Sequence, residues 1–108
     1  MPDYKLYLKD ILEAIEKIEE SIGNLSKEEF KRNIDKVDAS IMRIQVIGES
    51  IKKLPKEFKE KYKKIEWEKI SETRDIISHA YFKVNLDIIW DLINNKLHKL
   101  KEQIIKLI

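Results

Sequence analysis

Arg, Asp, His and Tyr side chains occur within one eight-residue stretch of the chain, at Arg74, Asp75, His79 and Tyr81. The chain has only two histidines and no cysteine. An imidazole can gain or lose a proton near neutral pH and is a common acid–base group. A guanidinium beside it suits a phosphate or a developing oxyanion. The combination indicates phosphodiester chemistry that needs no metal ion.

A structural interpretation competes with this one, because three fixed positions in R-x-x-x-x-H-x-Y also recur by chance. His79 would then lie in or near the core, and Arg74 and Asp75 would be solvated helix charges. On one helix, Arg74 and His79 would lie about 140° apart around the axis and roughly 7.5 Å apart along it. Asp75 and His79 would share a face, so Asp75 could orient the imidazole. Two such helices meeting at a two-fold axis would bring both pairs into one cleft.

The composition is typical of a protein built from long helices. Of the 108 residues, 43% are apolar and 39% are charged, with two Gly and two Pro. The net charge of +2 is too small to predict a strong field for nucleic acid. No apolar run approaches the ~20 residues of a membrane span, and the N-terminus lacks a signal-peptide pattern. We therefore expect a cytoplasmic protein.

The residue types also argue against several kinds of site. Without cysteine there is neither a disulfide scaffold nor a thiolate metal site. One His and one Asp on a helix are too few ligands for a metal ion. No Gly-rich loop is present to cradle a phosphate. We expect neither a metal ion nor a cofactor.

Apolar residues recur every three or four positions and predict five helices, over about 3–22, 26–53, 55–64, 67–81 and from 85 to the C-terminus. Ser26 and Glu29 have the spacing of a capping box, and Asn85 is placed to cap the last helix. The three long apolar stripes are Tyr4, Leu8, Ile11, Ile15, Ile18 and Ile22; Phe30, Ile34, Val37, Ile41, Ile44, Gly48 and Ile51; and Leu86, Ile89, Ile93, Leu97, Leu100, Ile104 and Leu107. Short turns between such helices predict an all-α, up-and-down bundle of four to five helices over a single domain, residues 1–108.

Two further features have open interpretations. The segment 55–64 carries five lysines, Lys56, Lys59, Lys61, Lys63 and Lys64. They form either a solvated face or a patch that follows a nucleic-acid backbone. His98 lies off the last apolar stripe, among lysines, and is interpreted as a surface residue.

Arg74, His79 and Tyr81 match the R-x-x-x-x-H-x-Y motif of the HEPN ribonucleases, and the chain most resembles their HepT-like toxins. The resemblance extends beyond the motif. Residues 47–50, I-G-E-S, resemble an I-G-E-A segment of that family. Further family features follow in the same order along the chain, namely Leu54-Pro55, Trp67, Tyr81-Phe82 and Trp90.

The resemblance implies a helical bundle that dimerises through its motif helices and a metal-independent endoribonuclease whose site is shared between the protomers. Arg74 and His79 would be catalytic, with Asp75 and Tyr81 in support. It also implies a partner, a minimal nucleotidyltransferase antitoxin that silences the toxin by adding AMP to Tyr81. Two positions depart from the family pattern, since Asp75 replaces a frequent Asn and Ala80 a frequent Gly.

Two other functions remain open. The chain could be a non-catalytic module that binds a nucleotide or substrate for a nucleotidyltransferase, with Arg74 and His79 holding a phosphate. It could also be a purely structural helical dimer. Neither the RNA preference nor the role of Glu49 follows from the sequence.

Overall fold

The computed structural model describes residues 4–79 and 85–108, and of residues 74–79 it describes the helical backbone but not the side chains. Every element within these ranges is a helix, as predicted. None of these helices is both long and apolar enough to cross a bilayer. In chain order they are α1 (Tyr4–Ile22), α2 (Lys27–Arg32), α3 (Ile34–Lys53), α4 (Lys56–Lys61), α5 (Trp67–His79), α6 (Leu86–Asp91), the π-helical segment η2 (Leu92–Leu97) and α7 (His98–Ile105).

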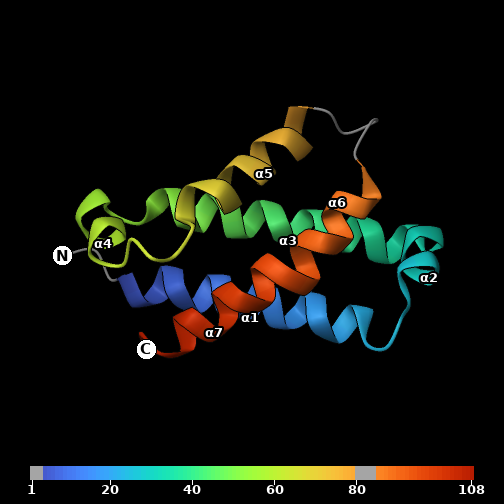
Figure 1. Ribbon diagram of the computed structural model, residues 1–108, viewed down its shortest axis with the longest axis horizontal. Helices are drawn as coiled ribbons and strands as arrows, with labels where there is room; N and C mark the ends of the chain where they lie inside the picture. The colour runs from blue at the N-terminus through green and yellow to red at the C-terminus, as the bar shows by residue number, and fades with distance from the viewer. Residues whose placement is uncertain (1–3, 80–84) are drawn as a thin grey trace.

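The two longest helices form an antiparallel pair that the other elements cover (Figure 1). Helix α1 packs along α3, and α5 packs on α3. The last three elements form one continuous helical segment, and its η2 and α7 parts pack on α1. This is the helical bundle that the stripes predict.

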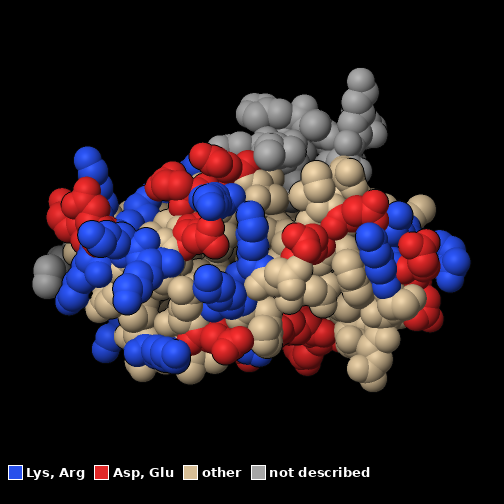
Figure 2. Space-filling view, in the orientation of Figure 1, with Lys and Arg blue, Asp and Glu red and all other residues tan. Residues whose placement is uncertain are grey.

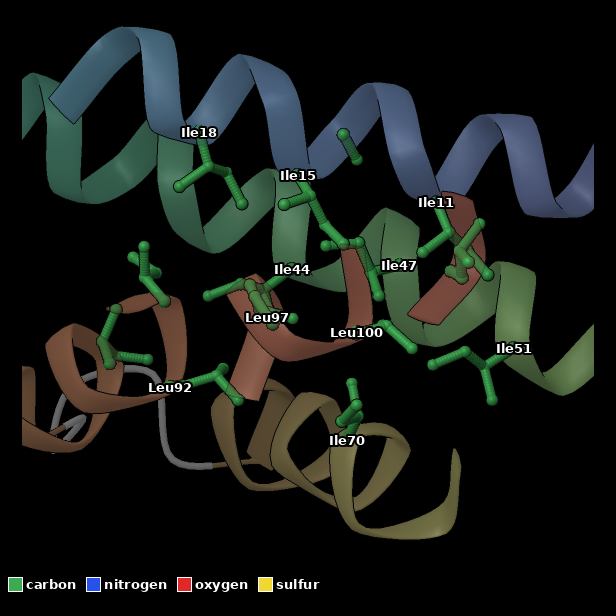
Figure 3. Close-up of a cluster of buried hydrophobic side chains, with 14 of the residues drawn as sticks. Ile11, Ile15, Ile18, Ile44, Ile47, Ile51, Ile70, Leu92, Leu97 and Leu100 are labelled. Carbon is green, nitrogen blue, oxygen red and sulfur yellow. The ribbon is translucent and has the colours of Figure 1, made fainter. Parts of the chain in front are cut away.

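The core lies where these helices face one another. Figure 3 shows side chains of α1 and α3 meeting those of α5, η2 and α7. All predicted stripe residues of α1 are buried except the half-buried Tyr4. Burial of these aliphatic side chains supplies the main driving force for the bundle.

The predicted helix over 26–53 is wrong in one respect, because the structure divides it at Asn33. The backbone there has φ −97° and ψ 89°, and the Asn33 side chain accepts a hydrogen bond from the Lys36 backbone N–H at 3.1 Å. Asn competes for backbone hydrogen bonds and is a favoured N-cap, which is why the helix can restart here. The break also turns Ile34 outward, to 70% exposure, although its spacing predicted a core residue.

The last helix also departs from a regular α-helix. Its stripe contains two consecutive steps of four, from Ile89 to Ile93 to Leu97. On an α-helix each step of four turns about 40° beyond a full turn, so the stripe would drift around the axis. Residues 92–97 form π turns, which are wider than α turns. Ile93 and Leu97 both lie in the core, 3% and 0% exposed.

A polar contact joins α7 to α1 beside this core. Lys101 Nζ donates to Glu19 Oε1 at 2.7 Å, and His98 Nδ1 lies 3.2 Å from Glu19 Oε2. Partial burial disfavours the charged form of Glu19, but hydrogen bonds with Lys101 and His98 outweigh it and hold the pKa of the carboxyl below its usual value. His98 is exposed, as predicted, and its Nε2 lies 3.1 Å from Glu102.

Glu19→Gln should lower the free energy of unfolding by about 1 kcal/mol near pH 7, the upper range for a partly exposed ion pair. Folding lowers the pKa of Glu19 from its usual value of 4.5. The contribution of Glu19 to stability is therefore complete above pH 4.5 and is lost as pH falls through the folded-state pKa. Urea unfolding from pH 7 to pH 3 would measure this. The free energies of unfolding of wild type and variant should converge near pH 3. Glu20→Gln, which changes the exposed neighbouring residue, serves as control. An equal difference at every pH would contradict a role for the charge.

Candidate active site

The motif lies on the second half of α5. Arg74, Asp75 and His79 all belong to this helix, which the structure describes through His79. Ala80 and Tyr81, which the sequence placed at the end of a helix over 67–81, lie outside the described residues. The roles of the four motif side chains therefore stay predictions.

The helical backbone determines how these positions are arranged. Because α5 remains α-helical through His79, Arg74 and His79 lie about 140° apart around its axis. Asp75 and His79 are one turn apart on the same face. On one copy of the helix, positions 74 and 79 therefore lie on different sides of the axis.

The first turns of α5 are fixed by an aromatic cluster. Trp67 is 3% exposed, and its Nε1 donates to the Tyr62 backbone carbonyl at 3.2 Å. The Phe58 ring lies between its neighbours, with centroids 6.2 Å from Trp67, 5.0 Å from Tyr62 and 5.3 Å from Tyr4. Aromatic pairs at these separations add to the stabilisation from burial. The cluster therefore sets the direction in which α5 leaves α4.

Helix α5 also packs on α3. Ile70 and Ser71, in the first half of α5, are buried. The I-G-E-S segment belongs to α3, where Ile47 and Gly48 are buried and Glu49 is exposed. The family-like residues at 47–50 thus include part of the packed face of the helix that supports the motif helix.

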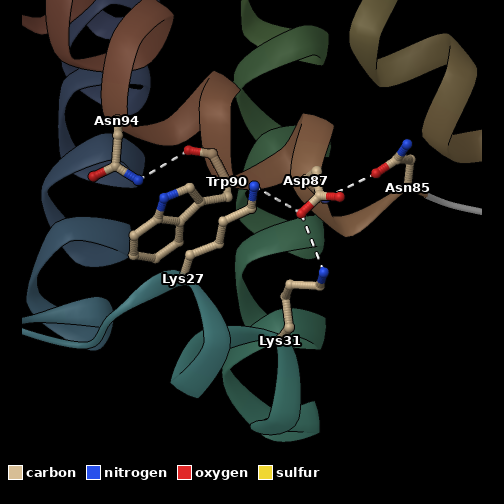
Figure 4. A network of polar contacts seen from close by, with 6 residues as sticks. All are labelled: Lys27, Lys31, Asn85, Asp87, Trp90 and Asn94. Atoms are coloured by element: carbon tan, nitrogen blue, oxygen red, sulfur yellow. Dashed lines mark hydrogen bonds and ion pairs between the residues drawn. The ribbon is translucent and has the colours of Figure 1, made fainter.

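Polar contacts fix the start of α6, the first described element after the motif (Figure 4). Asn85 caps α6, as predicted, by accepting from the Asp87 backbone N–H at 2.9 Å. Asp87 in turn contacts Lys27 at 3.0 Å and Lys31 at 3.2 Å, both on α2. Hydrogen bonds from these two lysines hold the pKa of Asp87 below its usual value.

Sequence reasoning predicted the Asn85 cap but did not consider the partners of Asp87. It missed the contacts with Lys27 and Lys31, which are 60 and 56 residues away along the chain. Only the tertiary fold brings α2 beside α6, so no local pattern could have found them. Among the described side chains, no three His, Asp or Glu residues come together as metal ligands would.

These observations define a class of protein, an all-helical bundle with an Arg and a His five residues apart on one supported helix. A comparison with protein families gives a more specific result. The family model described as "Ribonuclease HepT-like" matches residues 11–107. The chain therefore belongs to the HepT-like ribonuclease family.

Curated relatives agree with this family. The chain is 36% identical over 104 residues to a "Probable ribonuclease HepT" of Thermococcus cleftensis, covering 96% of this chain and 94% of that protein. It is 38% identical over 98 residues to a "Putative RNase" of Caldanaerobacter subterraneus subsp. tengcongensis, covering 91% and 88%. No solved structure gives a significant match.

A third relative is longer than this chain. It is a "Gamma-glutamylcyclotransferase and putative RNase" of Methanocaldococcus jannaschii, 45% identical over 105 residues. The match covers 97% of this chain but 47% of that protein. The similarity is therefore limited to about half of the Methanocaldococcus jannaschii protein.

Proposed function

We propose that this chain is a metal-independent endoribonuclease that acts as the toxin of a toxin–antitoxin pair in the cytoplasm. Membership of the HepT-like family supports RNA as the substrate. The observation that carries the proposal is the placement of Arg74 and His79 on one helix, α5, which packs on α3. An imidazole can transfer protons and a guanidinium can stabilise phosphate charge, so this pair suits phosphodiester cleavage without a metal ion.

The proposed reaction uses the 2′-hydroxyl of the RNA as nucleophile. Its oxygen attacks the adjacent phosphorus, and the bond to the 5′-oxygen of the next nucleotide breaks. His79 transfers the proton of the attacking hydroxyl or of the leaving oxygen. Arg74 stabilises the negative charge on the pentacoordinate phosphate. Asp75, one turn from His79, orients the imidazole, and Tyr81 helps to position the RNA.

We further propose that the active form is a homodimer with a site shared between protomers. Within one helix Arg74 and His79 lie on different faces, so a second copy is needed to bring an Arg and a His to one phosphate. The proposed contact is between the motif helices of the two protomers, α5 in this structure, as the family resemblance implies. The partner that silences the site is a minimal nucleotidyltransferase acting on Tyr81.

Incubation of the purified protein with labelled RNA in excess EDTA tests this proposal. The expected result is endonucleolytic cleavage with a 2′,3′-cyclic phosphate on the new end, because the 2′-hydroxyl displaces the leaving oxygen. Light scattering of the same sample should give the mass of a dimer. RNA that stays intact in EDTA but is bound would support the alternative, a non-catalytic module that accompanies a nucleotidyltransferase.

A further inference from the structure

Two surface hollows share Lys63 and Ile65, in the segment between α4 and α5. The larger one, of about 650 Å³, lies between α4 and the first turn of α5. The smaller one, of about 310 Å³, lies between residues 61–65 and the end of the chain around α7. Their charged linings differ, and the difference indicates which of them suits a phosphate.

The larger hollow is nearly balanced in charge. Three carboxylates line it together with four lysines, namely Glu60, Glu66, Glu68, Lys56, Lys59, Lys63 and Lys69. Lys59 lies 3.5 Å from Glu68, and Lys69 lies 3.0 Å from Glu66. A polyanion placed here would meet these carboxylates, so this hollow is a poor phosphate site.

The smaller hollow, which we call the basic hollow, has no carboxylate in its lining. Its charged residues are Lys61, Lys63, Lys64 and Lys106. All four are exposed, and none forms an ion pair with a carboxylate that the structure describes. Figure 2 shows Lys and Arg side chains gathered at the end of the molecule that holds α4. The basic hollow therefore concentrates positive charge in a chain whose total is only +2.

The floor of the basic hollow is apolar and partly aromatic. Tyr62, Ile65 and Leu107 line it beside the lysines. Lys61 Nζ lies 5.4 Å from the centroid of the Tyr62 ring, within the range of a cation–π contact. Lysines that hold a backbone beside an aromatic ring on which a base can stack are the usual elements of a single-strand site.

The basic hollow lies near the start of the motif helix. Residue 65 lines it, α5 begins at Trp67, and His79 is the last residue of α5. From Trp67 to His79, the first and last of the 13 residues of α5, the helix rises about 18 Å. At the ~3.4 Å per nucleotide of a stacked strand, this corresponds to about five nucleotides.

We propose that the basic hollow is a second contact site for single-stranded RNA, holding phosphates about five nucleotides from the bond that is cut. This inference rests on the proposed function, because it assumes that RNA is the polyanion that reaches α5. It assigns Lys61, Lys64 and Lys106 to RNA binding and leaves proton transfer to the motif. The hollow raises affinity for long RNA and takes no part in the chemical step.

The test compares two triple variants that each remove three positive charges. The hollow triple is Lys61→Gln, Lys64→Gln and Lys106→Gln. The control triple is Lys9→Gln, Lys17→Gln and Arg32→Gln, which alters exposed residues that do not line the basic hollow. Both are made in the His79→Ala chain, so that RNA is bound without being cut, and affinity for a labelled 12-nucleotide RNA is measured by fluorescence anisotropy.

Each lost phosphate contact lowers the salt slope of log K by about 0.7 for a single strand, so the hollow triple should lower it by about 2. Its affinity at low salt should fall about 10- to 30-fold. The control triple should change the slope by less than one contact. Circular dichroism checks folding, and Lys106→Gln alone should still lower the slope by about 0.7 if the triple misfolds.

Cleavage kinetics are measured in chains that keep His79. These kinetics separate this inference from the proposed function. On a long RNA the hollow triple should raise KM and leave kcat unchanged. If both triples have the same salt slope and the same KM, and both cleave RNA normally, the hollow does not bind RNA. The proposed nuclease activity would then still stand. If the hollow triple lowers the salt slope of RNA binding but the unmodified chain cleaves no RNA, the hollow binds RNA as proposed. The proposed nuclease activity would then be contradicted. Loss of binding to vesicles with 30% phosphatidylserine, with RNA affinity unchanged, would assign the hollow to a membrane and overturn the inference.

Discussion

Replacing His79 with alanine should slow RNA cleavage by about 10²–10⁴-fold, the usual loss when a general acid–base group is removed. Without the imidazole, the proton of the attacking 2′-hydroxyl or of the leaving oxygen has no positioned acceptor or donor. Arg74→Ala should cost about 10²–10³-fold, because the charge on the pentacoordinate phosphate is no longer stabilised. Both rates are measured with labelled RNA in EDTA, with light scattering to verify the assembly state.

His98→Ala is the matched control for this loss. His98 is the second of the two histidines in the chain, and it is exposed on α7 beside Glu19 and Glu102. Its removal should leave the cleavage rate within about twofold of wild type, since exposed contacts of this kind contribute little. Full activity in His79→Ala, or an equal loss in His98→Ala, would show that the proposed acid–base role is wrong.

Mixed dimers extend the same prediction to the shared site. Chains with Arg74→Ala and chains with His79→Ala, carrying different tags, are expressed together and the heterodimer is purified by both tags. If each phosphate is held by an Arg of one protomer and a His of the other, one complete pair survives in the heterodimer. Activity should then return to a large fraction of wild type. A heterodimer as inactive as its two parents would place Arg74 and His79 in one protomer's site.

The apolar spacing was sufficient to predict most of the fold, because the core of a bundle is made of stripes that repeat every three or four residues. Ile34 is a residue for which this failed. Its spacing fitted the stripe, but the cap at Asn33 interrupts the helix and resets the direction in which Ile34 lies. A cap inside a periodic stretch is a local competition between two hydrogen-bonding patterns, and spacing alone does not decide it.

The site was less accessible to sequence reasoning. The positions of Arg74 and His79 on one helix followed from local pattern, and the structure places both on α5. The contacts between distant segments did not follow from any local pattern. Asp87 contacts Lys27 and Lys31, and Lys106 lines one hollow with Lys61 and Lys64. Both groupings bring together segments that are 42 or more residues apart in the chain. Such contacts follow from how the helices are packed together, and that packing is a property of the whole bundle.

Tyr81→Phe should abolish modification by the proposed nucleotidyltransferase partner. In the proposed step the Tyr81 phenol oxygen attacks the α-phosphorus of ATP, a P–O bond forms, pyrophosphate leaves and the phenol proton is lost. Phenylalanine keeps the ring but lacks the accepting oxygen. The modified tyrosine would carry an anion seven residues from Arg74, and a phosphate is a natural partner for a guanidinium. Modification should therefore block RNA by bulk and by charge, without unfolding the bundle.

Wild type and Tyr81→Phe are each incubated with the nucleotidyltransferase and ATP, and intact mass and RNA cleavage are then measured. Wild type should gain the mass of AMP and lose cleavage, with its circular dichroism unchanged. Tyr81→Phe should keep its original mass and whatever cleavage it shows without the partner. Tyr62→Phe is the matched control, because Tyr62 lies in the aromatic cluster at the start of α5, away from the motif residues in sequence. Its mass gain should equal that of wild type. An equal gain on Tyr81→Phe would assign the AMP to another residue and contradict a switch at Tyr81.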